Sequence, residues 1–180
     1  MSARFVALLR GINVGKAKRI PMADLRVLLE SLGHTDVKTL LNSGNAVFAV
    51  PRGASPKLAA AISAAIEKRF GFEVPVIVKS AADLDAMTKE NTLAAKAPDH
   101  SRLLTVFAQS PADLKSLATL KPLLAKNETL LLGNHAAWLH CADGILESAV
   151  GEALLKAGKR FTTRNWATVE KIRALMQSAG

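Results

Sequence analysis

Residues 5–16 read FVALLRGINVGK and decide the fold, because they join a short apolar run directly to a loop rich in glycine and basic residues. The run Phe5–Leu9 is apolar at every position, which is typical of a strand buried on both faces. The loop extends to Arg19, and Pro21 then suits the first position of a helix. The chain is therefore predicted to begin with a strand, a glycine-rich loop and a helix.

The pattern continues through the first half of the chain. Leucines at 25, 28, 29 and 32 follow helical spacing, and Gly33 suits the end of that helix. Two apolar runs flank Asn42-Ser43-Gly44-Asn45, which has the residues of a hairpin turn. We expect strands over 37–41 and 46–50, a helix with Ser55 as N-cap and Pro56 as its first residue, a strand over 74–78 and a short helix after Ser80.

The second half repeats this order of elements. We expect a strand over 103–108, a helix after Ser110, strands over 129–132 and 136–141 around Gly133-Asn134, a helix over 145–154, a short strand over 160–162 and a helix over 165–177. Residues 23–26 (ADLR) recur as residues 112–115 (ADLK), although the repeat rests mainly on the order of elements. Both halves read β-α-β-β-α-β-α, and the split β-α-β motif of the ferredoxin-like fold is the natural solution for each.

The fold prediction is therefore an α+β protein formed by internal duplication of two ferredoxin-like β-α-β-β-α-β(-α) halves packed together. The halves are residues 1–90 and 91–180, and together they form one unit. Residues 89–101 show little periodicity and are the best linker candidate. Because the first strand of each half is apolar on both faces, we infer that the two sheets cover each other or share one core.

Charge indicates an anionic partner. The 180 residues include 24 Lys and Arg against 15 Asp and Glu, a net charge of +9. Two clusters contain no acidic residue: the first is Arg10, Lys16, Lys18 and Arg19, and the second is Lys156, Lys159, Arg160 and Arg164. The single cysteine excludes an internal disulfide framework, and no apolar run is long enough for a signal peptide or a membrane span. A cytoplasmic location is expected.

The loop after the first strand has the chemistry of an anion site. A glycine-rich turn before a helix offers free N–H groups and a partial positive charge, which favour a phosphate or a carboxylate. It is not a Walker A loop, because only three residues separate Gly11 from Gly15 and Ala17 stands where Ser or Thr is needed. The candidate ligand-binding residues are Arg10, Gly11, Asn13, Gly15, Lys18, Arg19, Ser43, Asn45, Arg164 and Asn165.

Each candidate also has a purely structural interpretation. The glycines suit a tight loop between a strand and a helix, and residues 42–45 suit a turn. Asn165 suits an N-cap, with Trp166 anchoring the last helix. The functional interpretation places Arg164 and Asn165 in one cleft with Arg10 and Asn13.

Other chemistries have weaker support. His135, His140 and Cys141 do not share one face of a strand, so no metal is expected, and no cofactor is expected either. Three alternatives to a phosphate-bearing small molecule stay open: a binder of nucleic-acid phosphates, an enzyme on a nucleotide-like or acyl substrate with Ser43 or Asn13 near the chemistry, and a protein-interaction module. Catalytic residues, ligand identity and oligomeric state are left open.

The motifs resemble a known bacterial family. Residues 8–15 (LLRGINVG), 21–25 (PMADL), 32–33 (LG), 43–45 (SGN) and 163–166 (TRNW) resemble the family called domain of unknown function 1697. The resemblance spans nearly the whole chain, with departures at Lys16, at residues 40–42 and at residues 147–148. It implies an α+β protein built by duplication, and it implies no activity.

Overall fold

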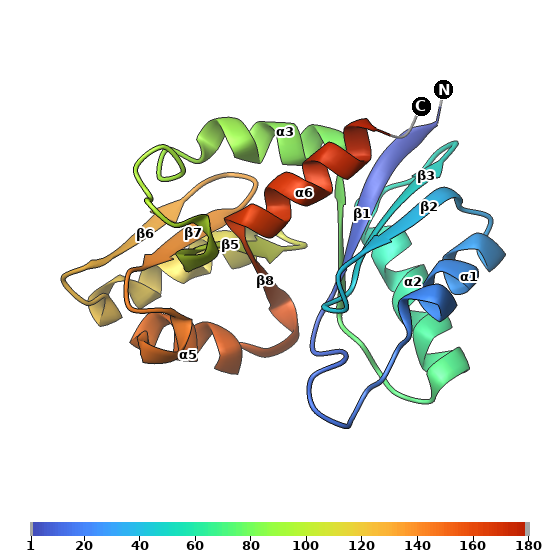
Figure 1. Ribbon diagram of the computed structural model, residues 1–180, viewed down its shortest axis with the longest axis horizontal. Helices are drawn as coiled ribbons and strands as arrows, with labels where there is room; N and C mark the ends of the chain where they lie inside the picture. Colours follow the sequence, from blue (N-terminus) through green and yellow to red (C-terminus); the bar gives the residue numbers. More distant parts are fainter. Residues whose placement is uncertain (1, 179–180) are drawn as a thin grey trace. The chain divides into compact units, whose positions relative to one another are not determined.

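The computed structural model describes residues 2–178, which form two four-stranded antiparallel sheets and six α-helices (Figure 1). The first half contains β1 (Ala3–Leu9), α1 (Met22–Ser31), β2 (Thr35–Leu40), β3 (Asn45–Val50), α2 (Ser55–Phe70), β4 (Val76–Ser80) and α3 (Ala81–Glu90). The second contains β5 (Leu103–Ala108), α4 (Pro111–Ser116), β6 (Glu128–Leu132), β7 (Ala137–Cys141), α5 (Ala149–Lys156), β8 (Phe161–Asn165) and α6 (Trp166–Gln177). The predicted α+β class is confirmed.

The two sheets have the same strand order. The first is ordered β2-β3-β1-β4 and the second β6-β7-β5-β8, so the first strand of each half lies inside its sheet. In the first sheet, Phe5 lies opposite Phe48 of β3 on one side and Ser80 of β4 on the other. The central position of β1 and β5 explains why Phe5–Leu9 is apolar at every position and why β5 is apolar except at Thr105.

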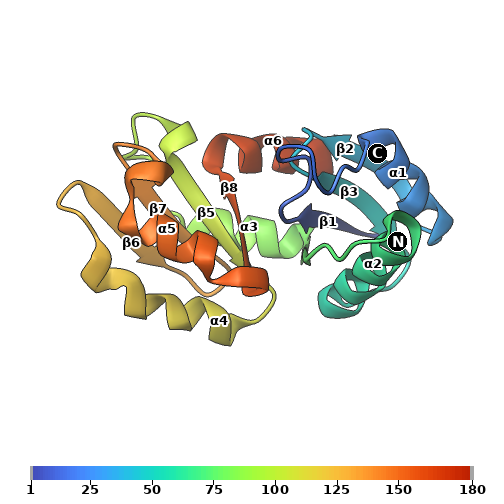
Figure 2. The ribbon, with the colours of Figure 1, turned by 90° about the horizontal axis from the view of Figure 1, so that it is seen from below.

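The core of the first half lies between one sheet face and the helices α1 and α2 (Figures 1 and 2). Phe5, Ala7 and Leu9 point to this core, where they join buried helix residues such as Leu25 and Ile62. Val6 and Leu8 alternate with them and are also fully buried. The prediction of a strand buried on both faces is therefore confirmed.

The second half is built in the same way. Leu104, Val106 and Ala108 of β5 pack with Leu114 of α4 and Val150 of α5. The residues between them on β5, Thr105 and Phe107, are buried too. Ala23-Asp24-Leu25-Arg26 and Ala112-Asp113-Leu114-Lys115 place their leucines at matching buried positions in α1 and α4.

Contacts divide the chain at the start of α3. One unit comprises the chain up to Ala81 together with the end of α6 from Ile172, and the other comprises Ala82–Lys171. Helix α3 therefore groups with the second unit, whereas the sequence predicts halves that meet at residues 90 and 91. Segment 91–99 follows this helix, so it lies inside the second unit. The packing of one sheet against the other stays a prediction.

Several element boundaries differ from the prediction for local reasons. Strand β4 begins at Val76 and not at residue 74, because Pro75 has no N–H to donate to a ladder. Helix α2 has Ala54 as N-cap, so the prediction that Ser55 caps it is wrong by one residue. Pro56 fits the first turn of this helix, where N–H groups have no intrahelical partner. Strand β8 extends to Asn165 and includes Arg164.

A carboxylate ties α3 to the hairpin turn of the second sheet. Glu90 accepts hydrogen bonds from the backbone N–H groups of Asn134 and His135 at 3.0 and 3.1 Å, and it contacts the imidazole Nδ1 of His135 at 2.7 Å. Gly133 makes room for it, since a Cβ there would lie 2.3 Å from the carboxylate. Desolvation raises the pKa of Glu90, but the bonds from His135 and Asn134 outweigh it and lower this pKa overall.

We expect Glu90→Gln to lower the free energy of unfolding by about 1–2 kcal/mol at neutral pH, since the hydrogen bonds of Asn134 and His135 then end on a neutral acceptor. A lowered folded pKa stabilises the protein above the ordinary value of 4.5, and this contribution disappears as the pH falls through the folded pKa. The free energies of unfolding of the two proteins, measured with urea, should therefore become equal well below pH 4.5. The exposed Glu67→Gln is the matched control, and a difference that persists in acid would contradict the assignment.

Candidate functional site

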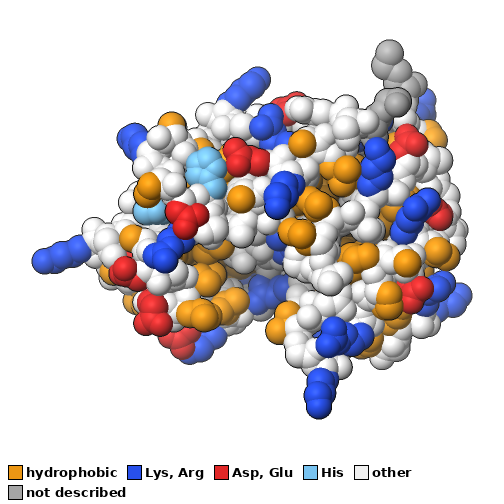
Figure 3. All heavy atoms as spheres, in the orientation of Figure 1, with side chains coloured by type: hydrophobic (Ala, Val, Ile, Leu, Met, Phe, Trp, Pro, Cys, Tyr) orange, Lys and Arg blue, Asp and Glu red, His pale blue; other side chains and the backbone are white. Residues whose placement is uncertain are grey.

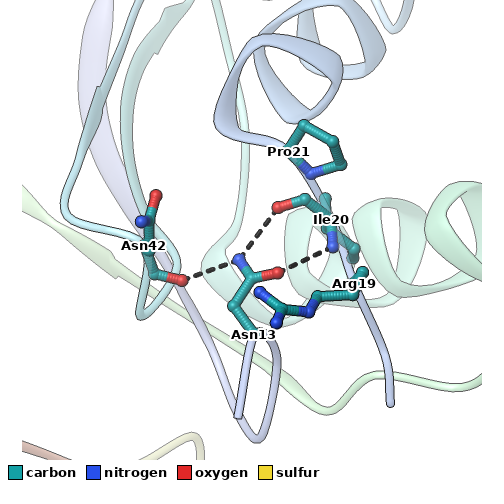
Figure 4. A pocket seen from close by; sticks show the side chains of 5 residues that line it. All are labelled: Asn13, Arg19, Ile20, Pro21 and Asn42. Carbon is teal, nitrogen blue, oxygen red and sulfur yellow. Dashed lines mark hydrogen bonds between the residues drawn. The ribbon is translucent and has the colours of Figure 1, made fainter. Parts of the chain in front are cut away.

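Asn13 organises the loop between β1 and α1. Its Oδ1 accepts a hydrogen bond from the N–H of Ile20 at 2.9 Å, and its Nδ2 donates to the carbonyl of Ile20 at 2.9 Å. The same Nδ2 donates to the carbonyl of Asn42 at 2.8 Å (Figure 4). Its backbone N–H donates to the carbonyl of Lys18. The amide thus closes the loop on itself and ties it to the turn between β2 and β3.

The loop needs residues that tolerate a left-handed backbone. Gly11 and Gly15 have φ of 71° and 65°, and Asn13 and Lys18 have φ of 56° and 50°. Glycine adopts this region readily and asparagine more readily than most residues. The side chain of Lys18 is also held in place, because its Nζ donates a hydrogen bond to the carbonyl of Glu73 at 2.9 Å.

The turn between β2 and β3 forms the second wall of the site. Asn45 is buried, and its Nδ2 donates to the carbonyl of Leu40 at 2.8 Å and to Ser43 Oγ at 3.2 Å. Gly44 has φ of 91°, and its carbonyl accepts a hydrogen bond from the N–H of Leu9 at 2.9 Å, which ties the turn to the end of β1. The predicted hairpin turn is confirmed.

A hollow of about 250 Å³ lies where the loop, the turn and the start of α1 meet. It is lined by Asn13, Arg19, Ile20, Pro21 and Asn42 (Figure 4). Pro21 is the N-cap of α1 and supplies no side-chain hydrogen bond to the helix. The first N–H groups of α1 therefore lack a side-chain cap at one end of the hollow. Asp24 is an acidic residue of this first turn.

The loop carries both positive charge and unpaired N–H groups. Residues 15–19 are exposed, and basic side chains project at the tip of this loop (Figure 3). The N–H groups of Gly11, Val14, Gly15 and Lys16 have no protein partner among residues 2–178. Arg10 is partly buried, which lowers the pKa of its guanidinium, and its backbone N–H donates to the carbonyl of Pro75. The arrangement suits a ligand that accepts hydrogen bonds and carries negative charge.

The segment Arg164-Asn165-Trp166, which the sequence singled out as a second candidate region, joins β8 to α6. Arg164 is 8% exposed, and its Nη1 donates to Thr162 Oγ1 and to the carbonyl of Thr163 at 2.9 and 2.8 Å. Burial lowers its pKa to about 10, so the guanidinium stays charged at neutral pH. Asn165 Oδ1 accepts from the N–H of Thr168 at 2.8 Å, which confirms the predicted N-cap. Trp166 is buried.

The predicted site residues thus fall into two groups. Asn13 and Arg19 line the hollow, Arg10, Gly11, Gly15 and Lys18 belong to the same loop, and Ser43 and Asn45 belong to the adjoining turn. Arg164 and Asn165 belong to the other unit, so a cleft shared with Arg10 stays a prediction. Sequence reasoning missed Ile20, Pro21 and Asn42 as lining residues. Asn42 contributes through its carbonyl, a group that every residue carries.

Residues 2–178 contain no cluster of three or more His, Cys, Asp or Glu side chains suited to a metal ion. His135 lies in the turn before β7, whereas His140 and Cys141 lie on that strand, as the predicted strand over 136–141 implies. Burial raises the pKa of Cys141 to about 11, although Ser148 acts in the opposite direction, so the thiol stays protonated at neutral pH.

None of the helices within residues 2–178 has the length and apolar character that crossing a membrane requires.

The fold and the hollow define an α+β protein with two antiparallel sheets and a polar, partly basic site at one β–α loop. The chain belongs to the family described as Protein of unknown function (DUF1697), whose model matches residues 2–138. A solved structure, described as that of the conserved bacterial protein SP0830 from Streptococcus pneumoniae, is 28% identical with a TM-score of 0.78. The match covers 98% of this chain and 99% of that chain. The comparison with curated proteins found no match. Neither description states an activity.

Proposed function

We propose that this is a cytoplasmic protein that binds an anionic, phosphate-bearing small molecule in the hollow between the β1–α1 loop, the β2–β3 turn and the start of α1. The observation that carries the proposal is the meeting of Arg19 with an uncapped helix start at one hollow. Phosphate groups bind readily where helix N–H groups and a guanidinium converge. Asp24 already contributes negative charge to this turn, so Arg19 and the loop N–H groups must provide most of the attraction.

The proposal assigns different roles to the residues. Arg19 neutralises charge, and the N–H groups of Gly11, Gly15 and the first turn of α1 donate hydrogen bonds to the phosphate oxygens. Asn13 acts as a positioning residue, because its amide is used within the chain. We also propose that the shared strand order reflects two ferredoxin-like halves that arose by duplication.

The proposal predicts that Arg19→Met weakens binding of a phosphomonoester about tenfold, since a charge-assisted hydrogen bond contributes roughly 1.5–3 kcal/mol. The measurement is a titration of the ¹⁵N-labelled protein with AMP and with inorganic phosphate, followed at the amide resonances of residues 11–23. Arg26→Met is the matched control, because Arg26 is exposed on α1, pairs with Glu30 and does not line the hollow. The proposal fails if these amides do not respond, or if both variants weaken binding equally.

A further inference from the structure

A second hollow lies in the other unit, between the segment after α3 and the sheet. Its volume is about 130 Å³, and it is lined by Leu93, Lys96, Ala97, Thr129 and His140. Thr129 of β6 and His140 of β7 are directly opposite in the ladder, so their side chains are neighbours on one sheet face. Lys96 comes from the turn that crosses beside them. All five residues belong to the second unit.

The three polar side chains of this hollow are not used elsewhere. Neither the ammonium of Lys96, nor the hydroxyl of Thr129, nor the imidazole of His140 forms a hydrogen bond or ion pair with another residue in the range 2–178. The neighbouring His100 differs, because its Nε2 contacts the carbonyl of Ala94 and its Nδ1 contacts Glu170. Three of the residues that line this small hollow thus carry hydrogen-bonding groups without protein partners in the described part of the chain.

The segment that carries Lys96 is held in place by its own hydrogen bonds. Asn91 Oδ1 accepts from the N–H groups of Leu93 and Ala94, both at 3.2 Å. The carbonyl of Leu93 accepts from the N–H groups of Lys96 and Ala97 at 3.0 and 2.9 Å. The position of the Lys96 backbone is therefore fixed before any ligand arrives, which reduces the entropic cost of binding.

We propose that this hollow binds one small oxyanion, with a phosphate group as its best occupant. Lys96 supplies a positive charge and donors, Thr129 supplies a hydroxyl donor, and the imidazole of His140 supplies an N–H donor. No carboxylate from residues 2–178 lines the hollow. Its volume of about 130 Å³ is sufficient for one tetrahedral anion. Lys96 opposes a metal cation, and an apolar ligand would leave three polar groups without partners.

The test is a titration of the full-length ¹⁵N-labelled protein with inorganic phosphate, with phenyl phosphate and with acetate, followed at the resonances of residues 93–97, 129 and 140. We expect inorganic phosphate to produce saturable shifts. Phenyl phosphate should produce them too if the bound phosphate group is open to solvent on one side. It should produce none if the hollow encloses the whole anion. Acetate should bind more weakly. Lys96→Met should reduce the phosphate affinity about tenfold.

Two variants keep this inference separate from the proposed function. Lys126→Met removes an exposed lysine of the same unit that does not line the hollow, and it should leave the phosphate affinity unchanged. Arg19→Met should weaken the phosphate response of residues 11–23 about tenfold, while the response of residues 93–97 persists unchanged. The inference is overturned if residues 93–97, 129 and 140 show no saturable shift, or if Lys96→Met and Lys126→Met weaken binding to the same extent.

Discussion

Gly44→Ala is expected to lower the free energy of unfolding by about 3 kcal/mol, the largest loss for a single methyl group in the first unit. A Cβ at this position would lie 2.8 Å from both the Cβ of Leu9 and the Cδ1 of Ile12. Both neighbours are buried, so neither can move without disturbing the core. The φ of 91° adds the cost of a left-handed backbone for a residue with a side chain.

Gly11→Ala is the matched control for this prediction. Gly11 also has a positive φ, 71°, but no atom lies within 4 Å of a Cβ built there. The free energy of unfolding of this variant should therefore fall by only about 1 kcal/mol, which is the cost of the left-handed backbone conformation. Urea unfolding of the three proteins measures both values. Equal losses for the two variants would show that contact between the turn and the β1 loop does not limit stability.

The fold was predictable because its signals are local. The continuous apolar run Phe5–Leu9 predicts a central strand, and the turn residues at 42–45 predict a hairpin. The boundaries that failed depend on single backbone groups. Strand β4 starts after Pro75 because proline lacks an N–H, and Ser55 lies inside α2 because Ala54 already occupies the cap position.

The candidate site was predictable only in part. Arg19 and Asn13 stand out in the sequence because they are polar residues in a glycine-rich loop. Packing of the core does not require such residues there. Asn42 could not be found in this way, because it takes part through its backbone carbonyl. The hollow beside His140 was missed for a different reason. Lys96 and Thr129 are 33 positions apart, and only the path of the chain after α3 brings them to one place.

Asn13 links the loop to the turn, so its replacement tests how the site is held together. We expect Asn13→Asp to lower the free energy of unfolding by about 2–4 kcal/mol at neutral pH. The aspartate keeps an acceptor for the N–H of Ile20, but it loses the donors to the carbonyls of Ile20 and Asn42. A carboxylate would then face two carbonyl oxygens that have lost their partner.

The dependence on pH separates this explanation from a general effect of mutation. Two carbonyl oxygens near the new carboxylate favour its protonated form and raise its folded pKa. The destabilisation should therefore increase as the pH rises through the ordinary aspartate value of about 3.9, and it should be smallest in acid. Urea unfolding across this range measures it.

Asn42→Ala provides the control, because the hydrogen bond from Asn13 ends on the backbone carbonyl of residue 42, which alanine retains. This variant should lose little stability at any pH. If Asn42→Ala is as damaging as Asn13→Asp, side-chain contacts of the turn hold the loop in place instead of the Asn13 amide. If only Asn13→Asp is damaging, one amide sets the shape of the hollow, and Arg19 at its edge can be varied without losing the fold.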